Sequence, residues 1–317
     1  MLTDDFASYK RELAPDLRVS LCDVTIQGGE LQGVADKSLE PGLYRFAAEH
    51  NISSRIVFIE PSSQYVLAER PYLRATAQAG SETVNETGYG ERVKVYDQSG
   101  ESYRVALVRD GYLGWLPLTA LVHHLPEPTH RFVALRGHIF LEAEVSGERL
   151  FRLAFGTQLR VEGSQGEWSQ IVYGKAQQGF VKTQSLWPLD KALPKVSRGA
   201  VASFARRFLE TPYVWGGVSA WGLDCSGLVQ TVFGAFDIAL PRDADQQSSC
   251  GEEISFEALK VGDLIFFPGH VALSLGGSRF LHANAHHMRV TVDDFETSSY
   301  GATMKAQITG VRRFISG

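Results

Sequence analysis

A single cysteine in the segment GLDCSGLVQTVF, residues 222–233, stands between an acid and a serine. Asp224 is a good N-cap residue, and the apolar residues that follow it repeat at helical spacing, so the pattern predicts a helix that begins at Cys225. Exposed backbone N–H groups and the positive dipole end of a helix favour a thiolate over a thiol. The sequence therefore offers Cys225 as a nucleophile that need not share the buried face of the helix, against the alternative of a small buried hydrophobic residue.

A cysteine nucleophile needs a base, and two histidines in the segment GDLIFFPGHVALSLGGSRFLHANA, residues 262–285, are placed to supply one. Two strands around a Gly-Gly-Ser turn predict a β-hairpin with a three-residue loop, in which Leu275 lies opposite Arg279. In that register His270 and His282 are diagonal neighbours on one face, about 7 to 8 Å apart at the backbone. One histidine is then the base and the other orients it, whereas a slip of one residue would separate them.

The other cysteines and histidines form no comparable group. Cys22 lies in the apolar run VSLCDVTI and is expected in the core, and Cys250 is expected to be incidental. In the pairs His123–His124 and His286–His287 adjacent side chains point to opposite faces of a strand, so neither pair predicts a metal site. The three cysteines are widely spaced and support neither a disulfide framework nor a CxxC site. We therefore expect no cofactor and no metal.

Composition and charge exclude several classes of protein. The chain has 317 residues, 44% apolar and 21% charged, which indicates a globular protein of two or three domains. A net charge of −5 and the absence of long Lys/Arg runs argue against a nucleic-acid or membrane-surface partner. No apolar stretch is long enough to span a bilayer, and the start MLTDDFASYK carries acids where a signal peptide needs basic residues. The prediction is a cytoplasmic protein without nucleic-acid or membrane partners; its oligomeric state is not predicted.

The chain divides into four predicted blocks. Residues 1–65 combine a short helix over Phe6–Leu13 with strand-like runs, and no role is predicted for them. Residues 66–126 and 127–190 consist of short strands between turns, which is typical of small β-barrels. The segments YRVALVRDGYLGWLPLTAL and SQIVYGKAQQGFVKTQSL echo each other, so we interpret the two blocks as copies of one module. A proline-containing linker leads to a last domain at 197–317, where helical and strand patterns mix.

Six motifs occur in order over residues 212–283, namely PYVWGG, DCSGLV, LPRDADQQ, GDLIFF, GHVALSLG and FLHA. Together they resemble the NlpC family of papain-like bacterial cell-wall cysteine peptidases. The resemblance implies an α+β domain in which a helix carrying the cysteine packs on an antiparallel sheet carrying the histidines. It makes Cys225 the nucleophile, His270 the base and His282 the orienting residue. Since the two β-modules look like bacterial SH3-like domains, the expected fold is two SH3-like barrels and an N-terminal α/β extension ahead of the papain-like domain.

The combination of domains resembles the intracellular dipeptidyl-peptidase branch of this family. That branch hydrolyses the γ-D-glutamyl bond to the L-diamino acid in murein peptides with a free N-terminal L-Ala, so the implied partner is a murein tripeptide or tetrapeptide. The implied chemistry is acyl transfer through a thioester. The backbone N–H of Cys225 and the phenol of Tyr213 are hypothetical donors to the oxyanion.

In the resembling branch the free amine of the substrate is held by residues beside the nucleophile and in the first SH3-like domain. The matching residues here are Asp224, Ser226, Tyr112 and Glu82, with Glu86 and Glu91 as alternatives to Glu82. An ammonium group in a half-closed pocket needs carboxylates to offset its desolvation, and acylation would remove the charge and leave them unpaired. In the alternative interpretation, Asp224 is only a helix cap, Tyr112 packs in the barrel and Glu82 is a solvated surface residue.

Two other functions stay open at this point. One is a cell-wall-binding protein in which the SH3-like modules attach to murein, although the missing export signal speaks against it. The other is an endopeptidase or amidase that acts on intact peptidoglycan. The sequence also leaves open whether the third residue of the substrate is diaminopimelate or lysine.

Overall fold

The computed structural model describes residues 2–193 and 195–315. The chain forms two compact units. Unit 1 consists of Met1–Val66, Leu73–Glu82 and Glu91–His123, and unit 2 consists of Leu67–Tyr72, Thr83–Gly90 and His124–Gly317. The units interleave along the chain, because two short stretches of the first predicted β-module, Leu67–Tyr72 and Thr83–Gly90, belong to unit 2 together with the C-terminal part of the protein.

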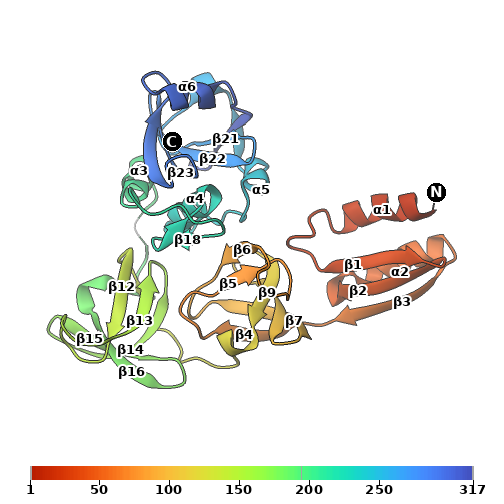
Figure 1. Ribbon diagram of the computed structural model, residues 1–317, viewed down its shortest axis with the longest axis horizontal. Coiled ribbons are helices and arrows are strands. Elements are labelled where there is room, and N and C mark those ends of the chain that lie inside the picture. The colour runs from red at the N-terminus through yellow and green to blue at the C-terminus, as the bar shows by residue number, and fades with distance from the viewer. Residues whose placement is uncertain (1, 194, 316–317) are drawn as a thin grey trace. The chain divides into compact units, whose positions relative to one another are not determined.

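The N-terminal part of unit 1 is a three-stranded sheet with two helices (Figure 1). Its elements are α1 (Leu2–Leu13), β1 (Cys22–Gln27), β2 (Glu30–Asp36), α2 (Glu40–Glu49) and β3 (Ser53–Ile59). β2 and β3 are parallel, and α2 supplies the crossover that a parallel pair requires. Phe6 and Phe46 from the helices pack with Cys22 in one apolar core, which confirms Cys22 as a core residue.

Helix α2 and strand β2 were not predicted from the sequence. In the segment EPGLYRFAAE, Glu40 is followed by Pro41 and Gly42, which are typical turn residues. In the structure Pro41 lies in the first turn of α2, where a missing N–H costs nothing and the fixed φ suits the helix. The predicted helix Phe6–Leu13 likewise starts earlier, at Leu2.

Two β-modules follow, and both have the same strand order. The strands of the first are β4 (Ser62–Val66), β5 (Tyr72–Arg74), β6 (Thr83–Glu86), β7 (Arg92–Ser99), β8 (Ser102–Leu107), β9 (Leu113–Pro117) and β10 (Leu121–Val122), in the order β10-β4-β7-β8-β9-β5-β6. The strands of the second are β11 (His130–Phe132), β12 (Arg136–Phe140), β13 (Arg149–Ala154), β14 (Gln158–Gln165), β15 (Trp168–Tyr173), β16 (Gln177–Lys182) and β17 (Leu186–Pro188), in the order β17-β11-β14-β15-β16-β12-β13. A 3₁₀ turn precedes the closing strand in each module, at Leu118–Ala120 and Thr183–Ser185. The two modules therefore share one topology, and the first sheet takes in Ser62–Val66, ahead of the predicted boundary at residue 66.

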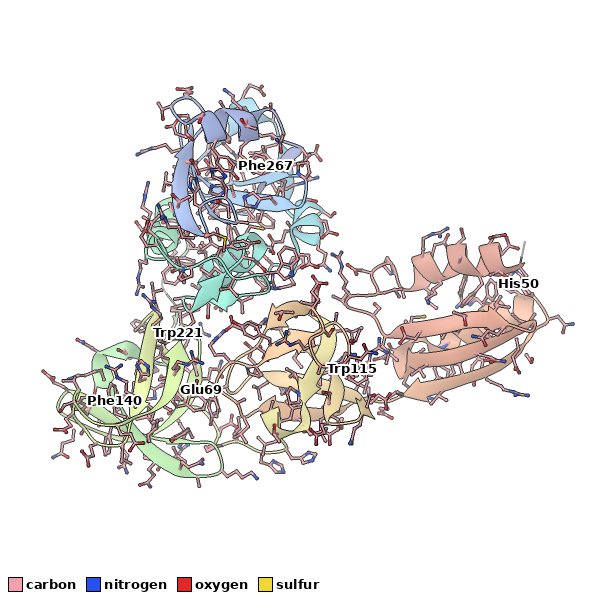
Figure 2. All side chains as sticks on the ribbon, viewed as in Figure 1. His50, Glu69, Trp115, Phe140, Trp221 and Phe267 are labelled. Atoms are coloured by element: carbon pink, nitrogen blue, oxygen red, sulfur yellow. The ribbon has the colours of Figure 1, made fainter. Side chains whose placement is uncertain are left out.

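In unit 2 the second β-module is tied to the C-terminal domain through Trp221, which Figure 2 labels. The indole N–H of Trp221 donates to the carbonyl of Leu153 over 3.1 Å. The guanidinium groups of Arg136 and Arg152 lie 5.7 and 5.5 Å from the centre of its ring. Arg152 also binds Glu69 at 2.8 Å, so one aromatic side chain and its cations join segments distant in the sequence.

The C-terminal domain packs helices on a six-stranded sheet (Figure 1). Its sheet has the order β20-β25-β21-β22-β23-β24, formed by β20 (Glu252–Ile254), β25 (Gly310–Arg313), β21 (Leu264–Phe267), β22 (His270–Gly276), β23 (Arg279–Asn284) and β24 (Arg289–Asp294). The remaining elements are α3 (Arg198–Arg206), β18 (Val218–Ser219), β19 (Gly222–Leu223), α4 (Cys225–Gly234), α5 (Ala244–Ser248) and α6 (Ser299–Lys305). Leu228 and Val232 of α4 share an apolar core with Val271 of β22. The helix that carries the cysteine therefore packs on the antiparallel sheet that carries the histidines, and the predicted α+β fold is confirmed.

The hairpin formed by β22 and β23 differs from the prediction only at its turn. Leu273 pairs with Leu281, as the predicted register requires. At the end of the strand, however, Gly276 rather than Leu275 pairs with Arg279, because a bulge lies between Ser274 and Gly276. Gly276 has φ +88°, a conformation that glycine adopts at little cost. The bulge takes up the extra residue, so the alignment around the histidines stays as predicted.

Candidate active site

Cys225 is the first residue of α4, as predicted, but its side chain is buried. The Asp224 side chain caps the helix and accepts a hydrogen bond from the Gly227 N–H at 2.7 Å. The Cys225 side chain belongs to the apolar core of the domain, and the residue is 8% exposed. The expectation that it need not share the buried face is therefore wrong, because the sheet covers the first turn of the helix as well as its apolar stripe.

Burial dominates the electrostatics of the thiol. It raises the pKa of Cys225 to about 11, and the charge of Asp224 raises it further, while the backbone N–H groups of Val271 and Ser226 and the cation of Arg242 act in the opposite direction. Because Val271 follows His270 on β22, its N–H places the thiol beside the start of the strand that carries the predicted base.

His270 and His282 are hydrogen bonded to each other. His270 Nε2 lies 2.8 Å from His282 Nδ1, and the two rings meet edge to face with centroids 5.1 Å apart. The structure thus brings together the pair that the hairpin register predicted. Burial, followed by the neighbouring His282, lowers the pKa of His270 to about 3, so its imidazole is neutral at physiological pH.

A carboxylate that the sequence analysis missed lies behind the histidines. Asp293 Oδ2 is 3.0 Å from His282 Nε2 and 3.0 Å from His287 Nε2. Strand β24 pairs with β23 so that Thr291 is opposite His282, and Asp293 is two residues further along the same strand. Burial by itself would raise the pKa of Asp293, but the hydrogen bond from His282 and its charge act in the opposite direction, and the pKa is lowered overall. The alternation in RVTVDD is a weak strand signal, but its register with β23 is not readable from sequence.

Tyr213, the predicted oxyanion donor, borders the thiol. Its backbone forms a bridge with Leu223, two residues before Cys225, and its N–H donates to Met288 O over 3.0 Å. Burial raises the pKa of the Tyr213 phenol to about 12, and the charges of Cys225 and Asp224 contribute to the rise. The phenol therefore keeps its proton and can donate a hydrogen bond at physiological pH.

Asp224 and Ser226, the residues predicted to hold the substrate amine, are both hydrogen bonded to the buried side chain of Arg242. Arg242 Nη2 lies 2.5 Å from Asp224 Oδ2, and Nη1 lies 3.1 Å from Asp224 Oδ1 and 2.8 Å from Ser226 Oγ. Asp224 also accepts hydrogen bonds from the Gly216 N–H at 2.9 Å and from Ser226 Oγ at 3.2 Å. Arg242 balances the charge of Asp224 beside Cys225. It lies within the motif LPRDADQQ, but no role was predicted for it.

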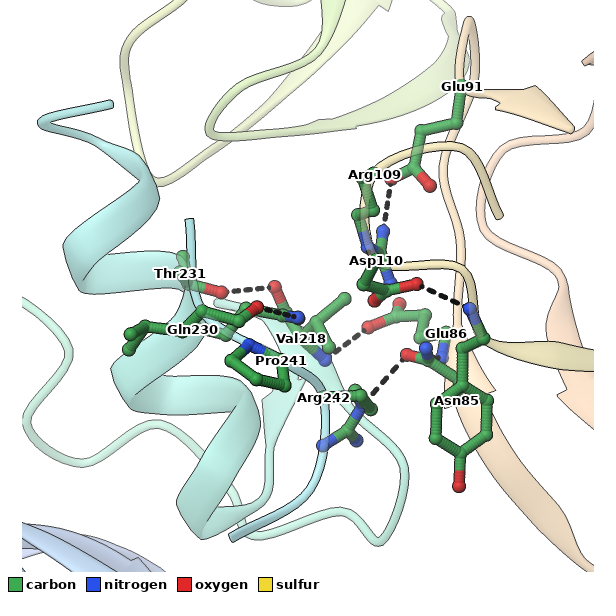
Figure 3. A network of polar contacts seen from close by, with 12 residues as sticks. Asn85, Glu86, Glu91, Arg109, Asp110, Val218, Gln230, Thr231, Pro241 and Arg242 are labelled. Carbon is green, nitrogen blue, oxygen red and sulfur yellow. Dashed lines mark hydrogen bonds and ion pairs between the residues drawn. The ribbon is translucent and has the colours of Figure 1, made fainter. Parts of the chain in front are cut away.

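The stretch Thr83–Gly90 completes this network within unit 2 (Figure 3). Asn85 Oδ1 accepts a hydrogen bond from Arg242 Nε at 2.9 Å. Glu86 is buried, forms an ion pair with Arg70 and accepts a hydrogen bond from the Val218 N–H at 2.9 Å. Glu86, one alternative to Glu82 for binding the amine, is thus engaged by partners from the protein itself.

The remaining predicted residues belong to unit 1. Tyr112 is buried and its N–H donates to Asp110 Oδ1 at 3.1 Å, whereas Glu82 is exposed. Glu91, the other alternative to Glu82, binds Arg109 at 2.5 Å. A role for Tyr112 or Glu82 in holding the substrate stays a prediction.

Within residues 2–193 and 195–315, no group of three or more His, Cys, Asp or Glu side chains is arranged to hold a metal ion. In the same residues no helix is both long and apolar enough to cross a bilayer.

A cysteine at a helix N-terminus, packed on an antiparallel sheet with paired histidines, defines the papain-like class of cysteine peptidases. Residues 210–313 match the model of the NlpC/P60 family, and residues 73–121 match that of the bacterial dipeptidyl-peptidase SH3 domain. The chain thus carries an NlpC/P60 cysteine peptidase domain together with a bacterial dipeptidyl-peptidase SH3 domain.

Several known proteins are similar over most of their length. A gamma-D-glutamyl-L-lysine dipeptidyl-peptidase from Bacillus subtilis is 29% identical over 212 residues, which are 62% of this chain and 70% of that protein. Dipeptidyl-peptidase 6 from Lysinibacillus sphaericus is 26% identical over 246 residues, 73% of this chain and 91% of that protein. The crystal structure of an NlpC/P60 family protein from Bacillus cereus has a TM-score of 0.71 at 19% identity, covering 80% of this chain and all of that one, and it supports the fold.

The pKa values of the thiol and the imidazole predict how Cys225 reacts with iodoacetamide in the absence of substrate. With the pKa of Cys225 near 11 and that of His270 near 3, both groups are neutral between these values. Only the thiolate reacts, so the alkylation rate should rise about tenfold per pH unit from pH 6 to 9 without levelling off. Mass spectrometry of the peptide containing Cys225 measures this rate, and the same peptide in unfolded protein is the control, levelling off above its ordinary pKa of about 8.5. A rate that is constant between pH 5 and 8 would instead indicate a preformed thiolate–imidazolium pair and contradict the prediction.

Proposed function

We propose that this protein is a cytoplasmic dipeptidyl-peptidase of murein peptide recycling. Its substrate is a murein tripeptide or tetrapeptide with a free N-terminal L-Ala, and it hydrolyses the bond between the γ-carboxyl of D-Glu and the L-diamino acid. The main structural support is the placement of Cys225 at the start of α4 beside the strand that carries His270. Two similar proteins that carry dipeptidyl-peptidase names support the substrate class.

The proposed mechanism begins with proton transfer from the Cys225 thiol to His270. Nε2 of His270 is hydrogen bonded to His282, so Nδ1 is the nitrogen left to accept this proton. The sulfur attacks the γ-carbonyl carbon of D-Glu, and the negative charge moves to the carbonyl oxygen. The backbone N–H of Cys225 and the phenol of Tyr213 donate hydrogen bonds to that oxygen.

Collapse of this intermediate breaks the C–N bond, and His270 protonates the departing amine of the diamino acid. The product at this stage is a thioester between Cys225 and the γ-carboxyl of L-Ala-D-Glu. His270, neutral again, takes a proton from water while the water oxygen attacks the thioester. Collapse of this second intermediate breaks the C–S bond and releases the dipeptide, and His270 returns its proton to the Cys225 thiolate, which restores the starting state.

Recognition of the free amine is the selective part of this proposal. Asp224 and Ser226 lie beside the nucleophile, but Arg242 already balances the charge of Asp224. A second carboxylate is therefore needed to offset the ammonium charge. In this proposal Glu82 supplies the second carboxylate, and Tyr112 is a neutral hydrogen-bonding partner of the amine.

The test compares two forms of one peptide. We expect L-Ala-γ-D-Glu-diaminopimelate to be cleaved to L-Ala-D-Glu and diaminopimelate, and the peptide whose amine carries a muramyl lactyl group to react at least about 30-fold more slowly. This factor corresponds to about 2 kcal/mol, the lower limit for leaving a charged group unpaired in a desolvated site. Chromatography of the products gives kcat/KM for each peptide, and Cys225→Ala protein is the blank.

Equal rates on the two peptides would contradict the free-amine site and favour an endopeptidase or amidase on intact peptidoglycan. A second pair of peptides with lysine in place of diaminopimelate belongs in the same assay, because the relative from Bacillus subtilis is named for a γ-D-glutamyl-L-lysine bond. Absence of cleavage of every free-amine peptide, together with binding to purified cell walls, would favour the cell-wall-binding alternative.

A further inference from the structure

Asp293 connects the histidine pair to a second group of polar side chains. It lies on β24, outside the six sequence motifs, and is 7% exposed. Its Oδ2 is within hydrogen-bond distance of two imidazoles, those of His282 and His287, each at 3.0 Å. Its Oδ1 accepts a hydrogen bond from Ser298 Oγ at 3.1 Å, so both oxygens of the carboxylate have donors.

An ionised carboxylate only accepts hydrogen bonds, and this decides where His282 carries its proton. Because Asp293 Oδ2 accepts from His282 Nε2, that nitrogen must be the protonated one. Burial lowers the pKa of His282, so its ring is neutral and carries a single proton. His282 Nδ1 therefore has a free lone pair.

The protonated nitrogen of His282 determines which nitrogen of His270 carries a proton. His282 Nδ1 lies 2.8 Å from His270 Nε2, and one of the two nitrogens must donate. Since His282 Nδ1 has no proton, His270 Nε2 is the donor, and His270 is also neutral. The lone pair of His270 is then on Nδ1, the nitrogen that takes the thiol proton in the mechanism above.

Asn284 competes with Asp293 for the same nitrogen. Its Nδ2 lies 3.0 Å from His282 Nε2, and its amide orientation is held because Oδ1 accepts from the His287 N–H at 2.7 Å. An amide N–H at this position favours a lone pair on His282 Nε2, which is the opposite tautomer. The proton would then move to Nδ1 of His282, His270 Nε2 would become the acceptor, and His270 Nδ1 would carry a proton instead of a lone pair.

We propose that Asp293 is a positioning residue that sets the tautomers of both histidines and thereby makes His270 Nδ1 the basic nitrogen. The carboxylate outweighs the amide of Asn284 because a hydrogen bond to a charged acceptor is about twice as strong as a neutral one. This inference rests on the proposed roles of Cys225 and His270. His287 binds the same oxygen of Asp293, and Tyr300, which stacks on His286, is a further ionisable side chain close to the carboxylate.

The tautomers can be read directly by ¹⁵N NMR of protein labelled in its histidines, without substrate. In the wild-type protein we expect protonated Nε2 and unprotonated Nδ1 for both His270 and His282. In Asp293→Asn protein we expect both rings to be protonated at Nδ1. Replacement of the His270 or His282 side chain by glutamine assigns the signals.

Kinetics provides the second measurement. We expect Asp293→Asn to lower kcat about 10² to 10⁴-fold with little change in KM, by analogy with the loss of the carboxylate that fixes the histidine tautomer in a serine protease triad. Asp293→Glu should recover part of kcat, because it restores the acceptor. Asp294→Asn is the matched control: this neighbouring carboxylate contacts the backbone of Glu296 and Thr297 rather than a histidine, and its kcat should stay within about twofold of the wild type.

Two results would overturn the inference. The first is a wild-type spectrum with His282 protonated at Nδ1, which needs no variant to fold. The second is an Asp293→Asn protein that keeps the wild-type tautomers of His270 and His282 although it is folded. A melting temperature equal to that of Asp294→Asn protein would show that it is folded. If none of the murein peptides is cleaved but the wild-type tautomers are as expected, the proposed substrate is wrong while the role of Asp293 is supported.

Discussion

Replacement of Cys225 by alanine is expected to abolish cleavage of L-Ala-γ-D-Glu-diaminopimelate, lowering kcat by about 10⁵-fold or more. Without the sulfur no thioester forms, and the histidine pair has no nucleophile to activate. The variant should remain folded, since loss of one buried sulfur at a helix start costs only about 1 kcal/mol. The measurements are kcat by product chromatography and the urea dependence of tryptophan fluorescence.

Cys250 is the matched control for this prediction. It follows α5, is partly buried and contacts the carbonyl of Gln246 through its sulfur at 3.4 Å. Cys250→Ala should keep kcat within about twofold of the wild type, as is usual for a substitution away from the site. Activity retained by Cys225→Ala, or lost in a folded Cys250→Ala protein, would remove Cys225 from its assigned role.

Arg242→Leu is expected to destabilise unit 2 by about 3 to 5 kcal/mol, the cost of breaking a buried ion pair by removing one partner. Arg242 is 1% exposed and donates to Asp224, Ser226 and Asn85, so its loss removes donors from three buried side chains at once. The carboxylate of Asp224 would remain at the N-terminus of α4 without its cation. Urea unfolding followed by tryptophan fluorescence measures the change.

Two further variants separate loss of the ion pair from loss of an arginine side chain. Arg289 and Glu210 form an exposed pair at 3.3 Å, so Arg289→Leu should change the free energy of unfolding by less than about 1 kcal/mol. The double variant Arg242→Leu/Asp224→Asn should be more stable than Arg242→Leu, because asparagine keeps the helix cap but has no charge to leave unpaired. A double variant less stable than the single one would contradict this account of the site.

Local sequence was sufficient to predict that a helix begins at Cys225. The cap at Asp224 and the apolar spacing after it depend on neighbours within two turns, and both predict the observed start of α4. The pairing of His270 with His282 was also predictable, because a short hairpin connects them and its turn restricts the register. The bulge at Leu275 was not predicted, but it lies beyond both histidines and leaves their alignment unchanged.

Interactions between distant segments account for what the sequence analysis missed. Arg242 contacts Asn85, which is 157 residues away, and no periodic pattern links two such positions. Asp293 reaches His282 only because β24 pairs with β23 in one register, and the segment between them carries no turn signal that specifies it. The burial of Cys225 likewise depends on the sheet that covers the first turn of α4.

The sequence by itself determined the class of the protein, the cysteine at the helix start, the histidine pair and the repeated strand pattern of the β-modules, since each is encoded in residues close together or in ordered motifs. The tertiary structure decided the electrostatic environment of these residues. It buries the thiol, places Arg242 against Asp224 and brings Asp293 behind His282. The physical reason is that burial and charge pairing are set by side chains from several elements, whose proximity exists only after the sheet and the helices have packed.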